Sequence, residues 1–340
     1  MSTPQPLLEI EDLVKHFPAP SGFSRRSAVR AVDGVSLQVY AGETLGLVGE
    51  SGSGKTTLGR CMLRLYDPTA GHIRFGGRDI TRMSQRQLRP LRREMQMVFQ
   101  DPHGSLNPRR KVGQILASVL RAHGAARGPA IVRGVADLLA SVGLAPEHAE
   151  RYPRAFSGGQ RQRIGIARAL ASHPKLIVAD EPVSALDVSI QAQVLNLLID
   201  LQAQHGLTYV VIAHDLGVVR QMCDRVGVMH LGKLVELGGC DDLYGRPIHP
   251  YTEALLSVIP VPDPVASAAR EKITLQGDPP SPMAPPPGCR FHTRCRYTKD
   301  VCRSVEPLLI THRPGHAAAC HYPLNVEMVG RERALAAAAA

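Results

Sequence analysis

The sequence of 340 residues predicts an α/β protein, on three observations. Short apolar runs of strand length alternate with segments whose apolar residues have helical spacing. A glycine-rich loop joins one such strand to one such helix, and the composition is that of a folded globular protein, with 44% apolar and 21% charged residues. At this length we expect about two domains.

The amino-terminal segment of residues 7–48 has the pattern of strands. Apolar residues alternate along 29–39, as in a half-buried strand, and residues 44–48 form a short apolar run that ends at a glycine. Helical spacing follows immediately, over residues 58–65. The order strand, glycine loop, helix is typical of an α/β core.

Residues 101–156 change character and predict a helical insertion. Helical spacing covers 115–120 and 131–142, and Gly143 is a plausible end of the second helix. Two further strands are expected at 176–180 and 208–213, with an amphipathic helix between them whose apolar face is Val194, Leu195, Leu198 and Leu201.

Charge and hydropathy restrict the possible partners. Lys and Arg exceed Asp and Glu by 40 to 30, which favours nucleotides, nucleic acid or an anionic lipid surface. Trp is absent and aromatic residues are only 4%, which weakens a base-stacking function. No run approaches the ~18 apolar residues of a membrane span, and no signal peptide is recognisable. We therefore expect a cytosolic protein, unless a partner holds it at a membrane.

The most specific motif is a phosphate-binding loop. It reads Gly49-Glu50-Ser51-Gly52-Ser53-Gly54-Lys55-Thr56, followed by Thr57, and matches G-x-x-x-x-G-K-[ST] between a strand and a helix. The glycines let backbone N–H groups surround phosphates at a helix N-terminus. Lys55 is expected to reach the terminal phosphates, and the Thr56 hydroxyl to bind Mg²⁺.

Two more elements complete the predicted nucleotide site. The strand at 176–180 ends in Asp180 and Glu181, which we expect to hold Mg²⁺ and to polarise the attacking water, respectively. The segment Ser157-Gly158-Gly159-Gln160 precedes helical spacing and offers a capped helix start that can bind an anion. The alternative for the first element is a strand with an acidic turn, and for the second an ordinary capped helix.

Together with Gln100, Asp187 and His214, these motifs resemble an ABC-transporter ATPase over about residues 7–250. The resemblance implies a P-loop ATPase core with an antiparallel β subdomain and a helical subdomain at about 101–160, within a nucleotide-binding domain of residues 1–258. It further implies that two ATPase domains face each other head to tail and share each ATP.

The resemblance also implies roles for residues outside the phosphate loop. Ser157 and Gly159 would contact ATP bound to the partner, and Asp187 would cross the dimer interface. Gln100 would sense Mg²⁺ and the lytic water, and His214 would touch the γ-phosphate.

In such ATPases an aromatic side chain packs against adenine, and Phe17 is the best match. The alternative is that Phe17 belongs to the core of an edge strand.

Other stretches resemble the ATPase subunits of dipeptide and oligopeptide importers: residues 99–109, 151–153, 249–252 and 287–295. This implies a second ATPase subunit, expected to be a paralogue, two transmembrane permease subunits and an extracytoplasmic peptide-binding protein. It places the chain at the cytoplasmic face of a bacterial inner membrane. Nickel and glutathione importers share much of the pattern and remain alternatives for the cargo.

Four of the seven cysteines cluster late in the chain, at Cys289, Cys295, Cys302 and Cys320. A proline-rich linker at 259–288 precedes this predicted module of residues 289–330. Four thiolates can hold zinc or an iron–sulfur cluster, and the C-x5-C-x6-C-x17-C spacing leaves the metal open. The importer resemblance favours a 4Fe-4S cluster over Zn²⁺. Buried free thiols are the alternative.

The rival class is an ABC-type ATPase acting on DNA or ribosomes. It would explain the basic charge, but DNA-repair relatives carry long coiled-coil or zinc insertions, and ribosome-associated ones carry two ATPase units. This sequence has one unit with a short insertion, and its basic runs are more typical of solvated faces. We therefore expect no nucleic-acid partner.

Overall fold

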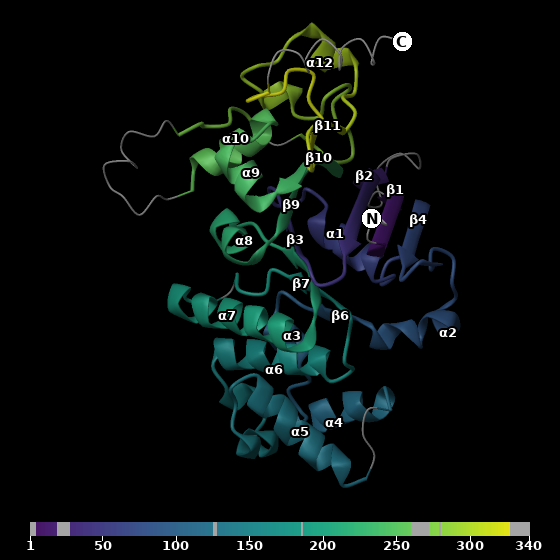
Figure 1. Cartoon of the computed structure of the whole chain (residues 1–340), viewed down its shortest axis with the longest axis vertical. Helices are drawn as coiled ribbons and strands as arrows, with labels where there is room; N and C mark the ends of the chain where they lie inside the picture. The colour runs from purple at the N-terminus through teal and green to yellow at the C-terminus, as the bar shows by residue number, and fades with distance from the viewer. Residues whose placement is uncertain are drawn as a thin grey trace.

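Two β-sheets organise the chain in the computed structural model, which describes residues 5–18, 28–124, 128–184, 186–259, 272–278 and 280–326. A four-stranded sheet has the order β2-β1-β4-β5, and an eight-stranded sheet the order β11-β12-β10-β9-β3-β8-β7-β6. Figure 1 shows α4 and α5 at one end of the long axis, the main sheet with α6 and α7 in the middle, and the C-terminal region at the other end.

The small sheet is antiparallel and comes mostly from the beginning of the chain. Its strands are β1 (Pro6–Pro18), β2 (Ala28–Tyr40), β4 (Ala70–Phe75) and β5 (Arg78–Asp79), with β1 paired to β2 and β4. On β2 the alternating residues Val35, Leu37 and Val39 are buried, as the sequence pattern predicts. This sheet is the antiparallel β subdomain that the resemblance implies.

The central strands of the main sheet are parallel. They are β3 (Thr44–Val48), β8 (Thr208–Ile212), β7 (Leu176–Asp180) and β6 (Met95–Val98), and β9 (Arg225–His230) pairs in parallel with the other edge of β3. Every residue of β3, β7 and β8 is buried. Such continuous apolar strands form where both faces of a parallel sheet are covered. The strands predicted at 44–48, 176–180 and 208–213 are therefore confirmed as β3, β7 and β8.

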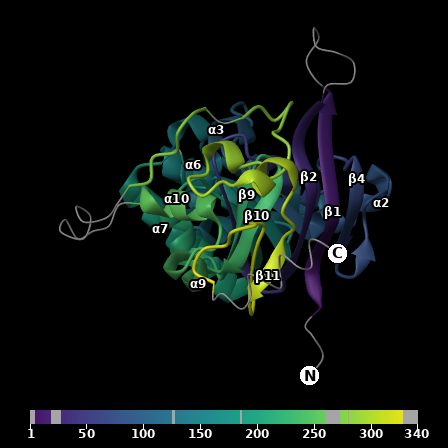
Figure 2. The same ribbon diagram turned by 90° about the horizontal axis from the view of Figure 1, so that it is seen from above.

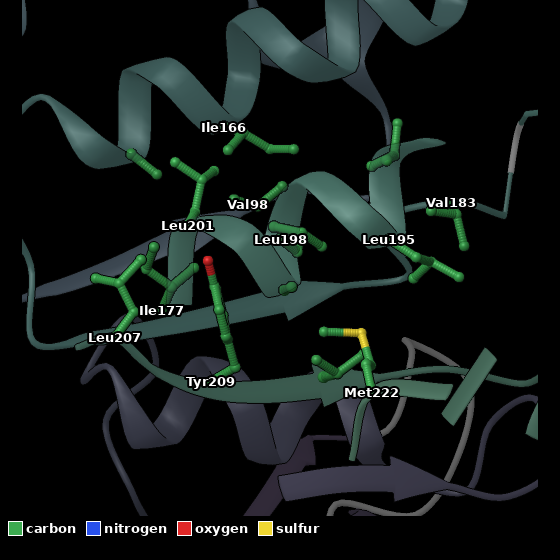
Figure 3. Close-up of a cluster of buried hydrophobic side chains, with 14 of the residues drawn as sticks. Val98, Ile166, Ile177, Val183, Leu195, Leu198, Leu201, Leu207, Tyr209 and Met222 are labelled. Carbon is green, nitrogen blue, oxygen red and sulfur yellow. The ribbon is translucent and has the colours of Figure 1, made fainter. Parts of the chain in front are cut away.

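Different layers cover the two faces of this sheet. Helix α1 (Lys55–Met62) belongs to the cluster that also contains the antiparallel sheet, whereas α6 (Gly158–Leu170), α7 (Val188–His205) and α8 (Leu216–Met222) belong to the other cluster. The buried residues of α7 are the predicted Val194, Leu195, Leu198 and Leu201. Figure 3 shows Leu198 and Leu201 between Ile166 of α6 and Tyr209 of the sheet.

The helical insertion packs on α6. It contains α4 (Val112–Ala122) and α5 (Ala130–Ser141), with the short turns α3 (Pro102–Ser105), η2 (Pro146–Glu150) and η3 (Pro153–Ala155). Helix α5 ends where predicted, because Gly143 adopts a φ of 71° that favours glycine. Between β5 and β6 lie α2 (Gln85–Leu88) and η1 (Leu91–Arg93). No helix in the described ranges is both long and apolar enough to cross a membrane.

The C-terminal region continues the main sheet. After β10 (Lys233–Gly239) come α9 (Cys240–Gly245) and α10 (Pro250–Ser257), then η4 (His292–Arg294), α12 (Asp300–Ser304), β11 (Ile310–Arg313) and β12 (His316–Ala318). Strand β12 pairs with β10, so the hairpin extends the sheet beyond β10 (Figure 2). The strands β4 to β6 and β9 to β12 were not predicted from the sequence.

A buried polar contact anchors this hairpin. Glu236 of β10 is fully buried and accepts the backbone N–H groups of Ile248 and His249, at 2.8 and 2.9 Å. Its other neighbour is Nε2 of His316 on β12, at 2.7 Å. A buried carboxylate is tolerated only when it is satisfied in this way. The predicted domain boundaries stay predictions, since much of 259–288 and residues 327–330 lie outside the described ranges.

We predict that Leu198→Ala, in the face of α7 that packs on the sheet, lowers the free energy of unfolding by about 2–5 kcal/mol, because it leaves a cavity. Leu198 has no exposed surface, whereas its neighbour Ile199 is 36% exposed. The matched variant Ile199→Ala should therefore cost much less. Urea denaturation of both variants checks the difference, and equal losses would contradict the packing described for α7.

Candidate active site

The predicted site residues follow the carboxyl ends of four neighbouring parallel strands. The phosphate loop follows β3, Gln100 follows β6, Asp180 and Glu181 end β7, and His214 follows β8. Because the four strands are parallel and adjacent, their ends meet at one edge of the sheet. This edge is where ligands bind in open α/β sheets.

The phosphate loop has a backbone that only glycine can adopt. Gly54, which precedes the first residue of α1, has a φ of 104°, and a Cβ there would lie 2.0 Å from the carbonyl oxygen of Ala31. At Gly49, with a φ of 145°, a Cβ would lie 2.1 Å from the carbonyl oxygen of Met229. The loop is therefore pressed against two neighbouring segments, and its last glycine directly precedes α1.

Lys55 lies inside this loop. Its Nζ donates to the carbonyl oxygens of Gly49 and Glu50, at 2.7 and 2.9 Å, and to Oγ of Ser53 at 3.3 Å. Burial lowers the pKa of Lys55, against the opposing effect of Glu181 and Asp180. The ammonium group is thus placed at the centre of a ring of backbone groups, as phosphate binding requires.

Thr56 and Asp180 form a pair of oxygen donors beside the loop. The Thr56 hydroxyl donates to Oδ1 of Asp180 at 2.8 Å, and burial raises the pKa of the Asp180 carboxyl. Hydroxyl and carboxylate oxygens suit Mg²⁺, which is usually bound by one or two protein groups together with phosphates and waters. The next residue, Thr57, is half-buried in α1.

Glu181 lies close to the two remaining polar residues of the site, Gln100 and His214. Its Oε2 accepts from Nε2 of Gln100 at 2.7 Å and lies 3.5 Å from Nδ1 of His214. Glu181 has a φ of 46°, a conformation that costs energy for a residue with a side chain and that is concentrated at functional sites. The structure thus brings together the three residues that the sequence analysis assigned to catalysis.

The segment Ser157–Gln160 forms a capped start of α6. The Ser157 hydroxyl accepts the N–H of Gln160 at 3.3 Å, and the Gln160 side chain accepts the N–H of Ser157 at 3.1 Å. A Cβ on Gly159 would lie 2.4 Å from Cγ2 of Ile190, so α6 approaches α7 closely. Within the described ranges, no hydrogen bond or ion pair joins this segment to residues 49–56.

Ser157 is exposed at this helix start. Two further predicted residues, Asp187 and Phe17, have the following surroundings. Asp187 is exposed at the beginning of α7, where it makes no side-chain cap. Phe17 is half-buried on β1, with its ring 5.4 Å from that of Tyr66 in an edge-on contact and with Lys15 Nζ at 4.9 Å. The adenine contact of Phe17 therefore stays a prediction.

Two residues that the sequence analysis did not assign to the site contact the phosphate loop. The hydroxyl of Tyr251 accepts the N–H of Glu50 at 2.8 Å, and the guanidinium of Arg294 binds both carboxylate oxygens of Glu50. Both lie in stretches that resemble importer ATPases, 249–252 and 287–295. That resemblance was the only available signal, and it carried no role for either side chain.

The four late cysteines line one cavity of about 10 Å³. Burial raises the pKa of Cys289 to about 11 and also raises the pKa of Cys295 and Cys320, and the neighbouring thiols add to the effect. The donor set suits a thiolate-bound metal, but the cavity is about the size of one water. Among the residues that the structure describes, no three metal-ligand side chains are grouped so as to hold an ion. The predicted metal centre is therefore not supported.

Comparison with known protein families agrees with this geometry. The model described as "ABC transporter" matches residues 32–184, and the model described as "Oligopeptide/dipeptide transporter, C-terminal region" matches residues 235–302. The first match contains the phosphate loop, Ser157 and Glu181. The second contains Tyr251 and Arg294.

Curated relatives extend the similarity over nearly the whole chain. The oligopeptide transport ATP-binding protein AppF of Bacillus subtilis is 54% identical over 318 residues, which cover 93% of this chain and 97% of AppF. A putative peptide import ATP-binding protein of Brucella ovis is 52% identical, covering 94% of this chain and 98% of the relative. The chain therefore belongs to the family of ABC transporter ATPases, and to its branch with the oligopeptide/dipeptide transporter C-terminal region.

Solved structures show the same fold. A dimeric post-hydrolysis state of the ATP-binding cassette MJ0796, bound to ADP and Pi, has a TM-score of 0.62 and 28% identity, covering 68% of this chain and 98% of that chain. The cbiO1 structure from Clostridium perfringens has a TM-score of 0.60 and 27% identity, covering 71% and 91%. The chain is thus an ATP-hydrolysing ABC subunit with the expected core fold.

We predict that Glu181→Gln lowers the rate of ATP hydrolysis by at least about a hundredfold, because an amide cannot accept a proton from water. ATP binding should persist, so the variant should accumulate as an ATP-bound dimer with little turnover. Phosphate release and sedimentation of the purified assembly measure the two effects. The matched variant Glu147→Gln, at an exposed position of η2, should hydrolyse normally, and a near-normal rate in Glu181→Gln would reject the assignment.

Proposed function

We propose that this chain is the ATPase subunit that powers a bacterial importer of dipeptides or oligopeptides. The observation that carries the enzymatic part is the grouping of Gln100, Glu181 and His214 next to the Thr56–Asp180 pair. The cargo follows from relatives whose names state oligopeptide or peptide transport and from the matching C-terminal model.

The site performs phosphoryl transfer mainly by positioning and charge neutralisation. The phosphate loop and Lys55 hold the terminal phosphates, and Thr56 and Asp180 hold Mg²⁺, which neutralises phosphate charge. Glu181 orients and polarises the attacking water. Gln100 holds the Glu181 carboxylate from β6, and His214 contributes a donor for the γ-phosphate.

A single copy carries only half of each catalytic site in this proposal. The start of α6 has a positive helix end and an exposed Ser157, whereas Gly159 is buried against α7. These groups complete the ATP site of a second ATPase subunit, which we propose to be a paralogue. Asp187 contacts that subunit, and Phe17 packs on adenine. Closure of the two subunits around ATP then drives the membrane subunits.

The partners and location follow from the same assignment. Two permease subunits receive the motion through the helical insertion, and a peptide-binding protein delivers cargo from outside. The chain works at the cytoplasmic face of the inner membrane. Nickel and glutathione importers are the alternatives for cargo, and the names of the relatives favour peptides.

We predict ATP-driven uptake of a labelled dipeptide by vesicles that contain this chain, its partner ATPase, the two permeases and the binding protein. Uptake should disappear when Lys55→Ala replaces the native chain, since the phosphates then lose their cation. Uptake of nickel or glutathione in place of the dipeptide would change the assignment of the cargo. DNA binding that is salt-sensitive and stimulates hydrolysis would contradict the transport function.

The proposal also includes a metal-binding role for the four late cysteines. We propose that Cys289, Cys295, Cys302 and Cys320 together bind a 4Fe-4S cluster, or Zn²⁺ as the alternative, in a structural or redox-sensing role. This part of the proposal rests on the chemistry of four thiols that line one cavity, although the described residues form no ion site. Because the cavity holds only about one water, the side chains would have to turn apart to admit such a group.

We predict that anaerobically purified chain is brown and contains iron, and that Cys302→Ser loses both properties. The matched control is Cys240→Ser, since Cys240 is also buried but lies at the start of α9, away from that cavity. Elemental analysis measures iron and zinc directly. Stoichiometric zinc without iron would refute the cluster, and the absence of both metals would leave four free thiols.

A further inference from the structure

The turn between Cys289 and Cys295 contacts two parts of the nucleotide site. Arg294, at the end of η4, places its Nη1 2.7 Å from Oε2 of Glu50 and its Nη2 3.1 Å from Oε1. The Arg294 side chain is only 7% exposed and that of Glu50 27%. A bidentate guanidinium–carboxylate pair with this burial fixes both groups more strongly than a surface ion pair does.

A second arginine of the turn reaches the antiparallel sheet. Arg290 donates to the carboxylate of Asp33 on β2 and to the carbonyl oxygen of Leu231. Asp33 also lies 3.0 Å from Nε2 of His16, the neighbour of Phe17 on β1. The turn thus bridges the phosphate loop and the sheet that carries Phe17.

Aromatic packing holds the turn in place between these two contacts. Phe291 is 2% exposed, and its ring lies 5.2 Å from that of Tyr251 and 5.4 Å from that of His230. Tyr251 in turn accepts the backbone N–H of Glu50. Glu50 is therefore held at its backbone by α10 and at its side chain by the turn.

The charge of Glu50 explains why the position of its carboxylate matters for phosphate binding. Its carboxylate belongs to a loop that must surround an anionic triphosphate, and an uncompensated negative charge there would repel the phosphates. Arg294 neutralises this charge and draws the carboxylate toward the C-terminal region. The planar guanidinium does so through two bonds, which a lysine cannot reproduce.

We propose that Arg294 is a positioning residue of the ATP site, which sets the conformation of the phosphate loop and neutralises it through Glu50. The C-terminal region then contributes directly to the nucleotide site. This inference rests on the proposed function in one respect, that the loop binds ATP.

The test measures the dissociation constant of Mg-ATP on the full chain with a fluorescent ATP analogue as the probe. Arg294→Ala should weaken binding by about tenfold, as expected for loss of hydrogen bonds to a charged group. Arg294→Lys should recover part of the affinity. Arg303→Ala removes an exposed arginine from the same region and should bind as the native chain does. In the assembled complex, Arg294→Ala should raise KM for ATP and leave kcat within about twofold.

A double variant that also removes the charge of Glu50 provides the decisive test. In the double variant Glu50→Gln, Arg294→Ala, affinity should return to within about threefold of the native value, because the unpaired carboxylate is gone. An Arg294→Ala chain that binds like Arg303→Ala, or a double variant no better than Arg294→Ala, would overturn the inference. The inference would also be overturned if the melting temperature of the Arg294→Ala chain, measured without nucleotide, fell in proportion to its loss of ATP affinity.

Lys55→Ala separates this inference from the proposed function. If the native chain binds Mg-ATP and Lys55→Ala abolishes binding, the loop is the ATP site, and a failure of Arg294→Ala concerns the inference alone. If Lys55→Ala has no effect, the proposed function itself fails.

Discussion

The parallel pairing of β3, β8, β7 and β6 is the constraint on which the rest of the structure depends. It brings the phosphate loop, the carboxylates after β7 and the polar residues after β6 and β8 to one edge of a fully buried sheet. Contacts between side chains at that edge then organise the chemistry. One of them is the Gln100–Glu181 hydrogen bond, which ties the carboxylate proposed to be catalytic to the strand that leads into the helical insertion. A change at the nucleotide can thereby reach the region proposed to face the permeases.

In the proposed function, each ATP site is unfinished within one copy. Helix α6 lies with the helices on one face of the sheet, whereas α1 packs with the antiparallel sheet on the other. The capped start of α6 is exposed and makes no recorded contact with the phosphate loop in the described residues. The proposed pairing of two ATPase subunits would bring these elements together.

Local patterns were sufficient to predict much of the fold and site, because each depends on neighbours in sequence. The spacing of Leu195 and Leu198 predicted the buried face of α7, and the glycines of the phosphate loop predicted its tight backbone. The Arg294–Glu50 pair could not be predicted, because its members are 244 residues apart and meet only after the C-terminal region docks. Cysteine spacing likewise could not establish whether the sulfur atoms converge on a metal.

The central claim is that each ATP is held by the phosphate loop of one subunit and by the start of α6 of the other. The most direct measurement compares Mg-ATP affinity of the isolated chain with hydrolysis by the assembled complex, after Ser157→Arg. The account predicts an affinity within about twofold of native and hydrolysis reduced at least about a hundredfold, since the long side chain obstructs the helix start and the cap on the N–H of Gln160 is lost. Loss of ATP affinity in the isolated chain, or undiminished hydrolysis by the complex, would contradict it.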